Sequence, residues 1–197
     1  MDSHYRKQLN RRYFTGLLMT FGLITILAIL MFSSGLIAAE ISNTKKTNSE
    51  QLTDVKTKTI FLVRHAEKES GNDPFLTAEG KIRAQNLSNL LQSVPLDAIY
   101  STDYNRTQDT AKPTASVQSL TITSYNPRKL SDFATAIKAN HHQRILIVGH
   151  SNTTPELVSL LGGIAGDEIV EATEFNRLYI LTIDHQEQQT SSVLLRY

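Results

Sequence analysis

The sequence predicts an α/β fold, a three-layer sandwich in which helices flank a mostly parallel central sheet. Two short, continuous apolar runs, residues 59–63 and 144–149, are typical of strands that are buried on both faces. Around these runs, segments with helical spacing alternate with further short strand-like segments, as in sheets covered by crossover helices. The absence of cysteine from the 197 residues excludes a disulfide scaffold and a thiolate metal site.

The composition narrows the class of protein further. Hydrophobic residues make up 40% of the chain, charged residues make up 20%, and the formal net charge is +1. These values exclude a disordered acidic or basic tail and a low-complexity chain. A dedicated nucleic-acid-binding protein carries a strong basic excess, so we expect no nucleic-acid partner.

The first 39 residues differ from the rest of the chain. Residues 1–13 form a basic flank, and residues 14–39 contain no charged side chain. A helix over 14–39 would be about 39 Å long, more than the roughly 30 Å of a bilayer core. We therefore expect either a transmembrane anchor or a signal peptide cleaved after Ala39. In both cases the domain lies on the non-cytoplasmic side, membrane-anchored or secreted, which is the periplasm in a bacterium.

A polar segment follows the apolar one. Residues 40–58 lack apolar periodicity and are predicted to form a flexible linker. The folded domain is therefore expected to span residues 59–197. Beyond Ala39 the chain carries 16 basic and 18 acidic residues, so this exported part is slightly acidic.

The elements of the domain follow from apolar periodicity and from residues that begin or end helices. Thr77 is placed as an N-cap, Pro113 is expected to stop or kink a helix, and Gly162 to end one. We predict strands at 59–63, 96–100, 120–125, 144–149, 178–183 and 192–196, and helices at 77–92, 104–112, 130–140 and 154–161.

Basic side chains follow the predicted strands at the point where each strand ends. Arg64 and His65 come after the first buried strand, and His150 comes after the second. Arg106 lies in the helix that follows the strand ending near Ser101. Because ligands bind beyond the carboxyl ends of parallel strands, these groups are expected to share one site. Guanidinium groups match phosphate oxygens, and a neutral imidazole is a nucleophile near pH 7, so the set predicts phosphoryl transfer.

Four sequence blocks carry a resemblance to a known family. They are Leu-Val-Arg-His-Ala-Glu at 62–67, Leu-Thr-Ala-Glu-Gly at 76–80, Ser-Thr-Asp-Tyr-Asn-Arg-Thr at 101–107 and Val-Gly-His-Ser-Asn-Thr at 148–153. From about residue 59 to its end, the chain resembles the histidine phosphatase superfamily, which has the phosphoglycerate-mutase-like fold, in its small-phosphatase branch. One such block is a weak signal, whereas four in family order are a strong one.

The resemblance implies roles for individual residues. His65 would be the nucleophile that becomes phosphorylated, and Arg64 and Arg106 would hold the phosphoryl oxygens. His150 would donate to the same group, and water would then hydrolyse the phosphohistidine. No metal and no cofactor are implied.

The resemblance leaves the proton donor for the leaving group open. Glu67, Glu156 and Asp132 are the candidates. The region after the third strand is short, which leaves the pocket open to a phosphorylated small molecule or a phosphoprotein. Mutase activity needs an enclosed site and is therefore disfavoured. Ser101, Asn152 and Lys68 are candidate substrate contacts.

Several other features are expected to have structural roles only. Gly80 is expected to serve close packing near the site, and His141 and His142 to complement the dipole at a helix end. Residues 167–174 are predicted to be a solvated acidic loop. Four arginines are predicted to be solvated surface charges: Arg83, Arg128, Arg144 and Arg177.

Three functions therefore remain open from the sequence. The leading one is a metal-independent phosphomonoesterase that works through a phosphohistidine. The second is a membrane-tethered phosphate-binding module without turnover. The third, a metal-dependent hydrolase using His65, His150 and nearby acids, lacks a compact metal-ligand motif.

Overall fold

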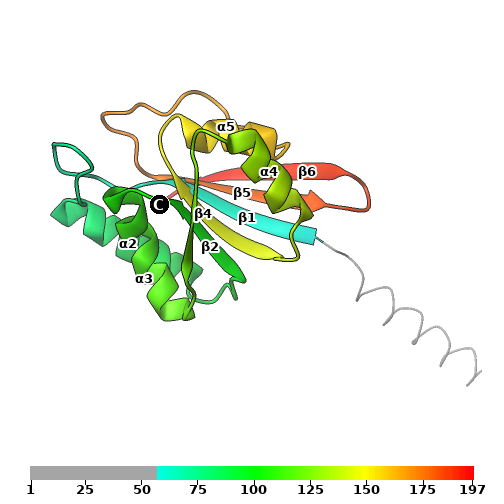
Figure 1. Ribbon diagram of the computed structural model, residues 1–197, viewed down its shortest axis with the longest axis horizontal. Helices are drawn as coiled ribbons and strands as arrows, with labels where there is room; N and C mark the ends of the chain where they lie inside the picture. The colour runs from blue at the N-terminus through cyan, green and yellow to red at the C-terminus, as the bar shows by residue number, and fades with distance from the viewer. Residues whose placement is uncertain (1–56) are drawn as a thin grey trace, which may run out of the picture. The chain divides into compact units, whose positions relative to one another are not determined.

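The computed structural model describes residues 57–197, which form one sheet with helices on both faces (Figure 1). Its strands are β1 (Thr57–Arg64), β2 (Ala98–Thr102), β3 (Ile122–Tyr125), β4 (Arg144–Gly149), β5 (Arg177–Asp184) and β6 (Gln189–Arg196). Its helices are α2 (Ala78–Leu91), α3 (Asn105–Gln118), α4 (Leu130–Ala139) and α5 (Thr153–Leu160). Every strand and helix predicted for the domain is present, with ends that differ by a few residues.

The six strands lie in the order β3-β2-β4-β1-β5-β6. β1 pairs in parallel with β4, and β2 pairs in parallel with both β4 and β3. β5 runs antiparallel to β1 and to β6. The predicted mostly parallel sheet is therefore confirmed. The carboxyl ends of β1, β2, β3 and β4 meet at one edge, where a ligand site is expected.

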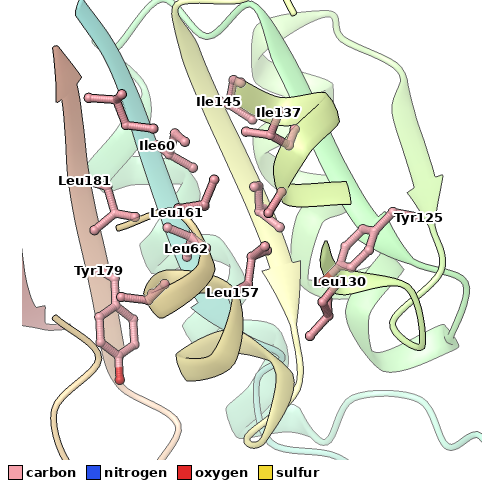
Figure 2. Packing of buried hydrophobic residues seen from close by; sticks show 14 residues of the cluster. Ile60, Leu62, Tyr125, Leu130, Ile137, Ile145, Leu157, Leu161, Tyr179 and Leu181 are labelled. Carbon is pink, nitrogen blue, oxygen red and sulfur yellow. The ribbon is translucent and has the colours of Figure 1, made fainter. Parts of the chain in front are cut away.

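The core lies in two layers, one on each face of the sheet. Ile60 and Leu62 of β1 pack with side chains of α4 and α5, in the cluster shown in Figure 2. Phe61 and Val63 of the same strand pack on the other face with side chains of α2 and α3. Both faces of β1 are thus buried, which explains its continuous apolar sequence and confirms the three-layer sandwich.

β1 begins at Thr57, earlier than the predicted start at residue 59, so Lys58 belongs to the sheet and not to a linker. The Lys58 side chain is fully buried, and burial lowers its pKa. Its Nζ donates to the carbonyls of Ile137, Lys138 (3.3 Å) and Asn140 (2.9 Å) at the C-terminal end of α4. Lys58 therefore complements the helix dipole, a role that was predicted for the two histidines that follow α4, His141 and His142.

α3 corrects a second expectation, because it continues through Pro113 to Gln118 and does not stop there. Thr114 and Ala115, which follow the proline, are buried against the rest of the domain. We attribute the continuation to this packing, which compensates for the hydrogen bond that Pro113 cannot make.

The predicted anchor or signal peptide, residues 14–39, and most of the predicted linker lie outside the described residues. Among the helices of residues 57–197, none has both the length and the apolar character needed to cross a bilayer.

Gly80, in the first turn of α2, is required by a close approach, as predicted. The Glu67 carbonyl oxygen accepts a hydrogen bond from Thr77 N at 3.0 Å. A Cβ on Gly80 would lie closer to this oxygen than van der Waals contact allows. The segment after β1 is therefore packed directly on the start of α2.

Gly80→Ala should lower the free energy of unfolding by about 1–3 kcal/mol, the usual cost of overpacking. This cost should exceed the gain of about 1 kcal/mol in helix propensity. Asn86→Ala, at an exposed position of the same helix, serves as the control and should raise the free energy of unfolding slightly, by about 0.5 kcal/mol, through helix propensity. Urea unfolding checks the pair, and a Gly80→Ala protein as stable as the wild type would contradict the close packing.

Candidate active site

Residues that follow all four parallel strands line one pocket of about 430 Å³. His65 and Lys68 follow β1, Arg106 follows β2, Arg128 follows β3, and His150 follows β4. The full set lining the pocket is His65, Lys68, Tyr104, Arg106, Pro127, Arg128, His150, Ser151, Asn152, Thr153 and Glu171. The sheet thus brings His65, His150 and Arg106 together, as the sequence predicted.

His65 lies at the base of this site with 2% of its surface exposed. Its Nδ1 lies 2.8 Å from the carbonyl oxygen of Ala66. Because a carbonyl can only accept, Nδ1 carries the hydrogen and Nε2 carries the free lone pair. Burial lowers the pKa of His65 to about 3, and the nearby charge of Arg64 adds to this effect. The imidazole is therefore neutral at pH 7 and presents a nucleophilic nitrogen.

His150 faces His65 with 5.6 Å between the ring centroids. Its Nδ1 lies 3.5 Å from Arg106 NH2, and its Nε2 lies 3.0 Å from the Thr102 hydroxyl. Because a guanidinium can only donate, Nε2 carries the hydrogen and donates to Thr102. Burial and then the charge of Arg106 lower the pKa of His150 to about 4.

A pair of buried threonine hydroxyls orients His150. Thr102 Oγ1 lies 2.9 Å from Thr107 Oγ1, which donates to the Thr102 and Tyr104 carbonyls. A chain of hydrogen bonds therefore runs from His150 Nε2 to the Thr102 hydroxyl, then to the Thr107 hydroxyl, and then to the backbone. Thr102 and Thr107 both lie in the third sequence block, but their role was not predicted, because sequence spacing does not show which hydroxyl meets an imidazole.

Arg106 is held loosely and retains donors for a ligand. Its NH1 lies 3.5 Å from Asp73 Oδ1, and its guanidinium lies 4.6 Å from the centre of the Tyr104 ring. The same Asp73 oxygen accepts from Asn105 N at 2.9 Å, which ties the loop after β1 to the start of α3. Arg106 Nε is buried without a hydrogen-bond partner. An anion in the pocket would satisfy it.

Arg64 lies beneath the pocket and does not line it. Its side chain is 1% exposed. NH1 donates to the Glu174 carbonyl at 2.9 Å and NH2 donates to the Glu171 carbonyl at 2.7 Å, while the guanidinium stacks 4.0 Å from the Phe175 ring centre. Arg64 Nε, like that of Arg106, is buried without a partner. The charge of Arg64 is therefore fixed next to His65 with one donor unused.

None of the three candidate proton donors lines the pocket. Burial raises the pKa of Glu67, but the hydrogen bonds and charge of Arg83 outweigh it, so that the pKa is lowered. The Arg83 Nε–Glu67 Oε1 distance is 2.9 Å. Glu156 is exposed on α5. Asp132 lines a different pocket, beside α4.

The candidate substrate contacts divide between the pocket and the core. Lys68 and Asn152 line the pocket. Ser101 is fully buried, and its hydroxyl donates to the Thr102 carbonyl at 3.0 Å, so it does not reach the pocket. Two residues that line the pocket, Arg128 and Glu171, were predicted from the sequence to lie on the solvated surface. Both lie in loops, where no periodicity indicates direction.

The acidic loop at residues 167–174, which was predicted to be solvated, is held in place by an ion pair. Arg177 is 6% exposed, which corrects its assignment as a surface charge, and its Nε lies 2.7 Å from Glu174 Oε1. Hydrogen bonds from Arg177 and then Arg196 lower the pKa of Glu174 to about 2. The Arg177–Glu174 ion pair fixes the segment in which the carbonyls of Glu171 and Glu174 bind Arg64.

Within residues 57–197, no group of three or more histidine, aspartate or glutamate side chains is arranged to hold a metal ion.

One family model and several solved structures are similar to this chain. The family model of the histidine phosphatase superfamily (branch 1) matches residues 60–126, a range that includes Arg64, His65 and Arg106. No sequence match was found among curated proteins.

Three solved structures show the fold. The α-ribazole phosphatase from Shigella flexneri is 20% identical with a TM-score of 0.56, over 71% of this chain and 96% of that one. The protein histidine phosphatase SixA, complexed with tungstate, is 16% identical with a TM-score of 0.57, over 70% of this chain and 96% of that one. The mycobacterial glucosyl-3-phosphoglycerate phosphatase is 12% identical with a TM-score of 0.51, over 72% of this chain and 98% of that one. These likenesses confirm the expected α/β fold.

The two neutral histidines should make stability depend on pH. Their pKa values in the folded protein, about 3 and about 4, lie below the ordinary value of 6.5. Below pH 6.5 the unfolded chain therefore binds protons that the folded chain does not, and the free energy of unfolding falls. Each histidine should contribute about 1.4 kcal/mol per pH unit between pH 6 and pH 5.

Urea unfolding at pH 7, 6 and 5 measures this dependence in the wild type and in His65→Gln. Carboxylates contribute equally in both proteins, so the difference in slope isolates His65. The variant should show the weaker dependence, and equal slopes would contradict a neutral, buried His65.

Proposed function

We propose that this chain is a phosphomonoesterase that works through a phosphohistidine on His65. One observation carries the proposal: a buried, neutral His65 presents Nε2 in a pocket that Arg106 also lines and beneath which Arg64 lies, and each arginine has a buried Nε without a hydrogen-bond partner. Such a site can bind a phosphoryl dianion and attack it. The match to the histidine phosphatase family model and the shared fold of solved phosphatases support it.

In the first step, the Nε2 lone pair of His65 attacks phosphorus and the bond to the leaving oxygen breaks. Arg106 lines the pocket and Arg64 lies beneath it, so both stabilise charge on the phosphoryl oxygens. The Nδ1–H of His65 keeps its hydrogen bond to the Ala66 carbonyl, which stabilises the positive charge that develops on the ring. The product is a phosphohistidine.

In the second step, water attacks phosphorus, and the electron pair of the P–N bond returns to Nε2. His150 faces His65 from the neighbouring strand and lies beside Arg106, so it is placed to contact the same phosphoryl group. Phosphate then leaves and neutral His65 is restored. No step requires a metal ion or a cofactor.

The pocket favours a phosphoryl group that projects from a larger molecule. Its volume of about 430 Å³ exceeds that of one phosphate, and Lys68 and Arg128 add positive charge to its lining. The comparison proteins are named for a phosphohistidine protein, α-ribazole phosphate and glucosyl-3-phosphoglycerate. A phosphoprotein and a small organic phosphate are therefore the two substrate classes to assay.

We also propose that residues 14–39 anchor the protein or export it, which places the phosphatase domain on the non-cytoplasmic side. The basic flank at 1–13 and the uncharged 14–39 support this location. Protease added to cells whose outer membrane is permeable and whose inner membrane is intact should cleave the domain. A domain that remains protected until the inner membrane is broken would contradict the location.

His65→Ala should reduce hydrolysis of 4-nitrophenyl phosphate by about 1000-fold or more, because the nucleophile is lost. His141→Ala, at an exposed position after α4, is the matched control and should keep full activity. Steady-state assays on the full chain measure both. Undiminished activity of His65→Ala would refute the phosphohistidine route. Tight tungstate binding by a wild type that hydrolyses no phosphate would favour the phosphate-binding module.

A further inference from the structure

The proposed reaction needs a group that moves a proton to the leaving oxygen. In the arrangement of the free protein, the hydrogen of neutral His150 is on Nε2, toward Thr102, and Nδ1 lies 3.5 Å from Arg106 NH2, so His150 directs no hydrogen into the pocket. The three acids named from the sequence lie elsewhere. Among the described residues that line the pocket, Glu171 alone carries a carboxyl group.

We propose that Glu171 is the general acid and base of this site, an inference that rests on the phosphatase function proposed above. Its side chain is 64% exposed, so the carboxyl group can exchange protons with solvent. Its Oε2 lies 3.1 Å from Arg64 NH2 and accepts a hydrogen bond from the Ser151 hydroxyl. Arg64 directly precedes His65, and Ser151 directly follows His150. The Glu171 carboxyl group therefore contacts a sequence neighbour of each histidine.

The backbone around Glu171 is held firmly enough to position a catalytic side chain. Its own carbonyl accepts from Arg64 NH2 at 2.7 Å. Three residues later, Glu174 forms its ion pair with Arg177 and accepts from Val170 N at 3.1 Å. The loop between α5 and β5 is thus fixed on both sides of Glu171, although the Glu171 side chain itself reaches into the open pocket.

The position of Glu171 suits both directions of proton transfer. A carboxyl group can donate a proton to a leaving oxygen and, as a carboxylate, accept one from water, so one side chain can serve both steps. Hydrogen bonds and an ion pair with Ser151 and Arg64 hold the Glu171 carboxyl group against the pocket that His65 lines.

The proton balance closes over the two steps. In the first, the P–O bond breaks, the Glu171 proton goes to the leaving oxygen, and the alcohol departs from phosphorylated His65. In the second, the oxygen of water bonds to phosphorus and the P–N bond breaks. The proton of that water goes to the Glu171 carboxylate, which restores the carboxyl group, and phosphate leaves.

A series of leaving groups tests this assignment on the full chain. A proton donor matters little when the leaving group is a stable anion and greatly when it is not. Glu171→Gln should therefore lower kcat/KM less than about 10-fold for 4-nitrophenyl phosphate, but about 100-fold or more for phenyl phosphate. Glu168→Gln, an exposed acid of the same loop, is the matched control and should leave both values unchanged.

The second step gives an independent readout. With 4-nitrophenyl phosphate, Glu171→Gln should release a burst of nitrophenol near one equivalent, because hydrolysis of the phosphohistidine lacks its base. Glu171→Asp should restore part of the rate on phenyl phosphate. An equal loss for both leaving groups, without a burst, would show that Glu171 only positions Arg64 and would overturn the proposal. A wild type inactive on both substrates would instead refute the phosphatase function.

Discussion

The parallel pairing of β1 with β4 is the constraint on which the site depends. Arg64 is the register partner of Gly149, and His65 N donates to the Gly149 carbonyl at 2.9 Å. The residues that follow β1 and β4 are therefore neighbours, which is why the His65 and His150 rings meet. Gly149 permits this arrangement, because a Cβ there would lie 2.8 Å from Thr154 Oγ1, in the first turn of α5. A one-residue slip of either strand would turn its histidine away from the pocket.

Burial and positive charge act in the same direction on the two histidines. Both effects disfavour the imidazolium form, so the fold keeps both imidazoles neutral at pH 7 without a neighbouring base. The buried Arg64 that contributes to this effect is compensated by backbone carbonyls and by the Phe175 ring. The segment before β5 is therefore part of the site, since its carbonyls hold the cation that lies next to His65.

The fold and the basic residues of the site could be predicted from the sequence because each has a local signature. Buried strands such as β4 show a continuous apolar run, and the residue after such a strand lies at the ligand edge. The role of Lys58 could not be predicted, because its partners at the end of α4 are distant in sequence. Glu171 was missed for a related reason: its direction depends on the Glu174–Arg177 ion pair and on Arg64, which no periodicity encodes.

The proposed mechanism places the phosphoryl group on His65. The most direct measurement is to mix the full chain with ³²P-labelled substrate, quench within milliseconds at alkaline pH, and map the labelled peptide by mass spectrometry. We expect an acid-labile, alkali-stable label on His65, absent from His65→Ala. A label on another residue, or turnover without any labelled protein, would contradict it.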